Sequence, residues 1–157
     1  LVARPKVLIK VVTAFTVAHT CTLILATLDW VSLPTRLVEA GIAASIVTVA
    51  WENLTPRERP HRWVLTFAFG LVHGFGFAEV LRGMSLPDEG LVRCLLSFNL
   101  GVEAGQLAIV GCLVWPMLRL RESSSYGPFV RRASWCLLIL GLGWFCDRVF
   151  GLGWMPF

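Results

Sequence analysis

Charged side chains are scarce in this sequence of 157 residues. Only 15% of the residues are charged, whereas an average soluble domain has about 25%. Hydrophobic residues make up 56% of the sequence, and the mean hydropathy is +0.71. These residues occur in long runs. Because so little polar surface is available, the composition excludes a water-soluble domain. It predicts an integral membrane protein whose main partner is the lipid bilayer.

Several motifs of other protein classes are absent. The chain has no GxSxG turn, no HExxH helix and no phosphate-binding loop, so we do not expect an enzyme. Its five cysteines show no CxxC spacing and mostly lie in apolar segments, where thiols behave as small hydrophobic groups. The net charge of +4 comes from dispersed basic residues and forms no stripe for nucleic acid.

Long apolar segments define the predicted fold, because about 20 such residues are needed for a helix to cross a bilayer. The sequence predicts an all-α, polytopic transmembrane bundle that forms a single domain over residues 1–157. Its helices are expected at residues 7–28, 37–53, 63–81, 91–118 and 133–150.

Basic residues alternate between the two sides of these segments, as the preference of Lys and Arg for the cytoplasmic side predicts. One side holds Arg4, Lys6, Lys10, Arg57, Arg59, Arg62, Arg119, Arg121, Arg131 and Arg132. The other side has only Arg36, Arg82, Arg93 and Arg148. We therefore expect a multi-pass protein of a bacterial inner membrane, with the start of the chain in the cytoplasm and the C-terminus outside.

Four polar residues fall near the middle of predicted helices: His19, His73, Asn99 and Glu103. Ionisable groups inside a bilayer are costly unless paired, so they usually mark a site or a pathway. Imidazole and carboxylate suit divalent nickel, cobalt or zinc, and these four residues are the predicted metal ligands. The same residues allow two other interpretations: hydrogen bonds that lock helices together, or an intramembrane metal hydrolase.

Helical spacing places further residues beside these four, because positions three and four apart share a face. Gln106 continues the stripe of Asn99 and Glu103, while Thr16 and Thr20 lie on a hydroxyl stripe flanked by His19. These three, with Glu52, Asn53 and Glu79 near helix ends, are candidates for a cavity or a gate. Two small-residue pairs are expected to pack helices: Gly70 with Gly74, and Gly101 with Gly105.

Four sequence blocks resemble the bacterial HupE/UreJ family of membrane proteins. They are residues 10–19 (KVVTAFTVAH), 49–53 (VAWEN), 69–78 (FGLVHGFGFA) and 97–106 (SFNLGVEAGQ). The resemblance implies a small permease with nickel as the usual proposed cargo and cobalt in some members. It also implies an earlier helix bearing histidine and aspartate, which is missing from this chain.

These observations lead to one main hypothesis and one alternative. The main hypothesis is a permease that binds or passes a divalent transition metal through a central polar cavity, with no tightly bound cofactor. The alternative is a structural or assembly subunit of a larger membrane complex, in which the polar cluster holds helices together and nothing is transported.

Overall fold

The computed structural model contains five helices, and it describes residues 5–55, 61–83 and 90–155. The helices are α1 (Pro5–Thr27), α2 (Thr35–Leu54), α3 (Arg62–Gly83), α4 (Leu91–Arg121) and α5 (Tyr126–Phe150). No strand occurs in the described residues. Each helix contains a stretch long and apolar enough to cross a membrane, which confirms the predicted all-helical fold.

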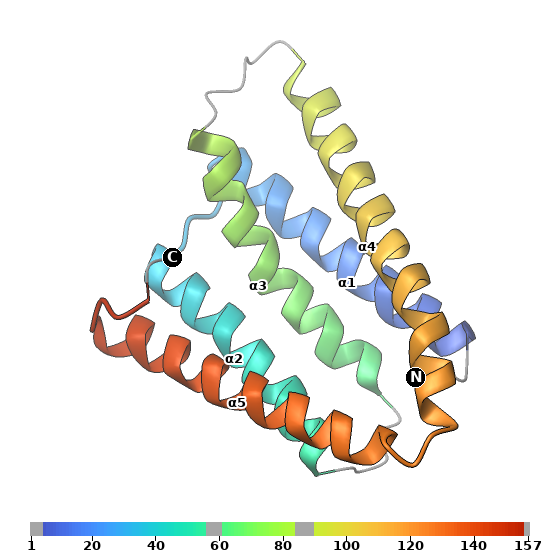
Figure 1. Ribbon diagram of the computed structural model, residues 1–157. Coiled ribbons are helices and arrows are strands. Elements are labelled where there is room, and N and C mark those ends of the chain that lie inside the picture. Colours follow the sequence, from blue (N-terminus) through green and yellow to red (C-terminus); the bar gives the residue numbers. More distant parts are fainter. Residues whose placement is uncertain (1–4, 56–60, 84–89, 156–157) are drawn as a thin grey trace.

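The helices are arranged as two packed pairs with a fifth helix at the side (Figure 1). The pair of α1 and α3 packs most extensively, followed by the pair of α2 and α5, and α2 joins the two pairs through α3. Helix α4 touches α1 only sparsely. The α1–α3 pair is therefore the most tightly packed part of the bundle.

Two predicted helix boundaries are wrong, both around the connection between α4 and α5. Helix α4 continues to Arg121 and α5 already begins at Tyr126, whereas the sequence predicted an end at residue 118 and a start at residue 133. Pro128 lies in the first turn of α5, where a backbone N–H is not needed for the helix. Basic residues in the last turn of α4 are favourable because they face the negative end of the helix dipole.

A small hydrophobic core joins α1, α3 and the start of α4. Its buried members are Leu23, Ala26, Ala78, Leu81 and Leu95. Much of the remaining apolar surface is exposed, and on α4 Leu100 and Trp115 are both 66% exposed. Such a surface would be unfavourable in water but fits hydrocarbon, since the backbone groups of each helix are bonded within that helix.

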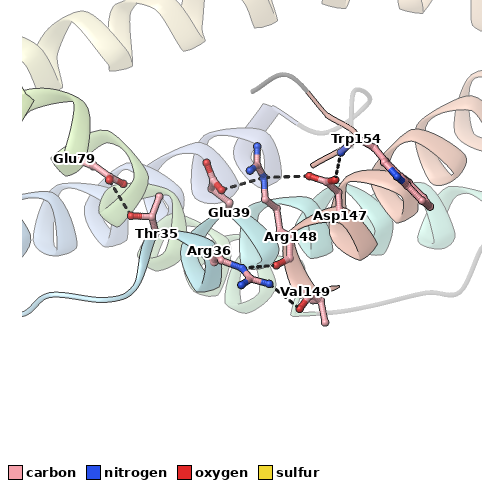
Figure 2. A network of polar contacts seen from close by, with 8 residues as sticks. All are labelled: Thr35, Arg36, Glu39, Glu79, Asp147, Arg148, Val149 and Trp154. Carbon is pink, nitrogen blue, oxygen red and sulfur yellow. Dashed lines mark hydrogen bonds and ion pairs between the residues drawn. The ribbon is translucent and has the colours of Figure 1, made fainter. Parts of the chain in front are cut away.

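A polar network fastens the start of α2 to the end of α5 (Figure 2). The Arg36 guanidinium donates hydrogen bonds to the carbonyl oxygens of Arg148 and Val149, at 3.0 and 3.2 Å. Arg148 forms an ion pair with Glu39, with 3.0 Å between Nε and Oε2. The buried carboxylate of Asp147 accepts a hydrogen bond from the backbone N–H of Trp154. This network satisfies the carbonyls at the C-terminus of α5 and holds the α2–α5 pair together.

Candidate functional site

Helices α1 and α3 approach most closely at two glycines of α3. A Cβ added to Gly70 would meet the carbonyl oxygen of Phe15 and would lie 2.9 Å from the Cβ of Ala18. A Cβ on Gly74 would meet the carbonyl oxygen of His19. The absence of side chains at both positions therefore lets the two backbones come together beside His19 and His73.

Phe15 on α1 lies against the histidine of each helix. Its ring centroid is 5.9 Å from that of His19, nearly parallel to it, and 5.4 Å from that of His73, edge to face. His19 also meets Phe77 edge to face, with ring centroids 5.4 Å apart. The two imidazoles thus share aromatic neighbours at the α1–α3 contact, and we call this cluster of rings (Phe15, His19, His73 and Phe77) the histidine pocket.

The hydrogen bonds of His73 determine which nitrogen is available to a ligand. Its Nδ1 lies 2.8 Å from the carbonyl oxygen of Phe69. A carbonyl can only accept, so Nδ1 carries the proton and donates, and the lone pair of the neutral ring is on Nε2. The α3 backbone therefore presents His73 as an Nε2 donor to a metal or as an acceptor to another group.

The side chain of His19 is buried, and no hydrogen bond among the described residues replaces the contacts with water that it loses. The residue is 1% exposed, and neither ring nitrogen has a hydrogen-bond partner among the described residues. A buried polar group usually finds a partner, because leaving it unpaired costs about 1–3 kcal/mol. The hydrogen bond between His19 and His73 that a purely structural role would use does not occur here.

Among the described residues, two side-chain hydrogen bonds connect α4 to α1. The hydroxyl of Thr20 donates to Oδ1 of Asn99 at 2.9 Å, and the hydroxyl of Thr16 lies 3.4 Å from Oε1 of Gln106. The amide of Asn99 also donates to the carbonyl oxygen of Leu95. The polar stripe of α4 therefore faces the hydroxyl stripe of α1.

Replacing Thr20 with valine should weaken the attachment of α4. The substitution preserves the shape of the side chain and removes the only donor that Asn99 Oδ1 has among the described residues. We expect a loss of about 0.6–1.7 kcal/mol, the range of interhelical hydrogen bonds in membrane proteins. Unfolding of the purified protein in detergent would measure it. Thr13→Val, at an exposed position of α1, is the matched control, and an equal loss in both variants would contradict this role for Thr20.

The predicted ligands do not all meet at one point. His19 and His73 belong to the histidine pocket, whereas Asn99 accepts a hydrogen bond from Thr20. Helical spacing puts the half-buried Glu103 between Asn99 and Gln106, on the face of α4 that meets α1. Within the described ranges, no three His, Cys, Asp or Glu residues form a group that could hold a metal.

The three gate candidates near helix ends lie at opposite ends of the bundle. Near the end of α3, Glu79 accepts a hydrogen bond of 2.8 Å from the hydroxyl of Thr35. At the end of α2, Glu52 is half-buried and Asn53 is exposed. Neither end is part of the histidine pocket.

The second glycine pair has no partner helix in the described chain. A Cβ on Gly101 or on Gly105 would meet no atom within 4 Å. The predicted helix packing at this pair is therefore not found, because α4 turns the side of Asn99 towards α1 and leaves the glycines on its outer face.

Phe15 is the residue of this site that the sequence interpretation passed over. Its position four residues before His19 puts the two rings on one face of α1, and this spacing is a usable signal. Its contact with His73 depends on how α1 and α3 pack, and no local pattern encodes it.

Comparison with known families agrees with this arrangement of blocks. The family described as HupE / UreJ protein matches residues 1–148 of the chain. The chain belongs to the HupE/UreJ family. This confirms the resemblance of the four blocks. The family is a membrane transporter family rather than a family of enzymes, and it is linked to nickel uptake. The five candidate spans make the chain a multi-pass membrane protein. No curated protein and no solved structure shows a significant match to this HupE/UreJ family member.

Proposed function

We propose that this protein binds a divalent transition metal ion inside the bundle and passes it across the membrane. Nickel is the leading cargo, and cobalt and zinc are the alternatives with similar ligand chemistry. His19 and His73 supply the imidazole nitrogens, while Glu103 contributes charge and Asn99 orients the α4 side of the pathway.

The observation that supports this proposal most directly is that the ring of His19 lacks hydrogen-bond partners in the described part of the chain. Both of its nitrogens are buried and lack a hydrogen-bond partner in the described part of the chain, although His73 offers Nε2 in the same aromatic pocket. A bound cation would use one lone pair from each imidazole, and this would offset part of the cost of burying the ring of His19. The first coordination shell would then contain two protein nitrogens.

An incomplete ligand set favours passage over permanent binding. A structural zinc site has four protein ligands and is closed, whereas ions in transit must leave as easily as they enter. Two histidines meet this requirement, since two protein nitrogens leave the other coordination positions of the metal open to exchange. The remaining positions would be taken by water or by Glu103.

The two ends of the bundle provide entry and exit. Glu79 stands near the end of α3, while Glu52 and Asn53 stand at the opposite end of the bundle, at the end of α2. The end that carries Lys6, Lys10, Arg119 and Arg131 is the cytoplasmic one, following the preference of basic residues for that side. Glu79 would then face the outside of a bacterial inner membrane.

Uptake of radiolabelled nickel, cobalt and zinc by cells producing the full-length protein tests this function. We expect uptake of nickel above that of cells with an empty vector, and a fall of about tenfold or more in Glu103→Gln, which removes the charge but keeps the shape. Glu122→Gln, at an exposed position after α4, is the matched control and should transport like the wild type.

Equal uptake by producing and empty cells would contradict the permease for those ions. If the protein were also retained in stoichiometric amounts with a larger membrane assembly, the result would favour the assembly subunit instead.

A further inference from the structure

A separate cavity of about 500 Å³ lies between the end of α2 and the start of α5, and we call it the α2–α5 cavity. Its lining residues are Trp51, Asn53, Leu54, Thr55, Tyr126, Gly127, Val130, Arg131 and Trp135. The histidine pocket shares none of these residues. The cavity therefore needs an explanation of its own.

The cavity is lined by one cationic side chain and by mainly apolar or aromatic residues. Arg131 supplies the positive charge, and no acidic side chain among the described residues forms an ion pair with it. Trp51 and Trp135 are about half exposed, at 54% and 47%, so their rings face the surroundings of the bundle. A transition metal cation is a poor occupant, because Arg131 would repel it.

The cavity lies at one end of two candidate membrane spans, where the boundary of the membrane is expected. Helix α2 ends at Leu54 and α5 begins at Tyr126, so the cavity lies where two spanning helices stop. Tryptophan and tyrosine are typical of the depth at which lipid headgroups begin. Helix α5 also has no acidic residue in its first turn, so the positive end of its dipole adds to the charge of Arg131.

We propose that the α2–α5 cavity binds the headgroup of an anionic phospholipid. Arg131 contacts the phosphate, and Trp51 and Trp135 pack against the glycerol and the upper acyl chains. A lipid fits better than free phosphate, because the cavity is far larger than one phosphate ion and most of its wall is apolar or aromatic. The bound lipid joins α2 to α5 at the end opposite the network of Arg36 and Arg148. This proposal does not depend on the cargo of the histidine pocket.

Native mass spectrometry of the full-length protein in detergent tests the site, with phosphatidylglycerol, with phosphatidylcholine of the same acyl chains, and with glycerol phosphate. We expect phosphatidylglycerol to bind best. Arg131→Ala should weaken its binding about fivefold, which corresponds to about 1 kcal/mol for one basic group near the surface. Arg132→Ala changes the charge equally at an exposed neighbour outside the lining, and it should bind like the wild type.

A second variant fills the cavity without touching the charge. Gly127 lines the cavity, and a Cβ there would meet no atom within 4 Å, so the Cβ of Gly127→Leu causes no clash and the rest of the side chain adds volume at the cavity wall. It should also weaken binding of phosphatidylglycerol. Equal losses in Arg131→Ala and Arg132→Ala, no preference for phosphatidylglycerol over phosphatidylcholine, or equally strong binding of glycerol phosphate would each overturn the lipid site.

Discussion

Replacing His73 with alanine should lower the affinity of the purified protein for nickel by about tenfold or more. The structure gives the reason: Nδ1 is occupied by the carbonyl oxygen of Phe69, so Nε2 is the nitrogen that a metal would use. Removing the ring removes that donor and leaves His19 alone in the pocket. Equilibrium dialysis with nickel would measure the change.

The chain offers a matched control for this experiment. His61 is the one histidine of the sequence outside the proposed site. It lies exposed before α3, so His61→Ala should bind nickel like the wild type. His73→Asn is informative as well, because its amide keeps a donor near Phe69 but lacks the Nε2 lone pair. Unchanged nickel binding in His73→Ala and His73→Asn, with both variants folded, would refute the metal role of His73.

Gly70→Ala should destabilise the bundle by about 1–3 kcal/mol, the usual cost of forcing extra atoms into a packed interface. The added Cβ would meet the carbonyl oxygen of Phe15 and the Cβ of Ala18. Neither is the tip of a flexible side chain, so α1 must move away from α3. Because Phe15 contacts both histidines, the same shift should weaken nickel binding.

Gly101→Ala provides the comparison, since the same methyl group would meet no atom within 4 Å there. Alanine also favours a helix more than glycine does, so this variant should be as stable as the wild type or slightly more so. Unfolding in detergent followed by circular dichroism would measure both. If the two variants lost equal stability, close packing at Gly70 would not be the cause.

The sequence by itself determined the membrane class, the existence of five spanning helices and the family. Hydrophobicity summed along a segment is a local property, and lipid imposes the same requirement on every span, so these features needed no knowledge of packing. The sequence predicted the positions of helix ends less reliably than the existence of the helices. The last helix was predicted from residue 133, but it begins at Tyr126, and Pro128 occupies its first turn, where proline is tolerated.

Only the tertiary structure decided which polar residues meet. Helical phase placed Asn99 and Gln106 on one stripe, but the rotation and tilt of α4 against α1 select Thr20 and Thr16 as their partners. The two glycine pairs look alike in sequence, yet one packs against α1 and the other faces outwards. Phe15 joins the histidines, and Arg131 comes to lie near Trp51, for the same reason. Contacts between helices depend on the balance of all their packed surfaces, and no single segment of the sequence contains that balance.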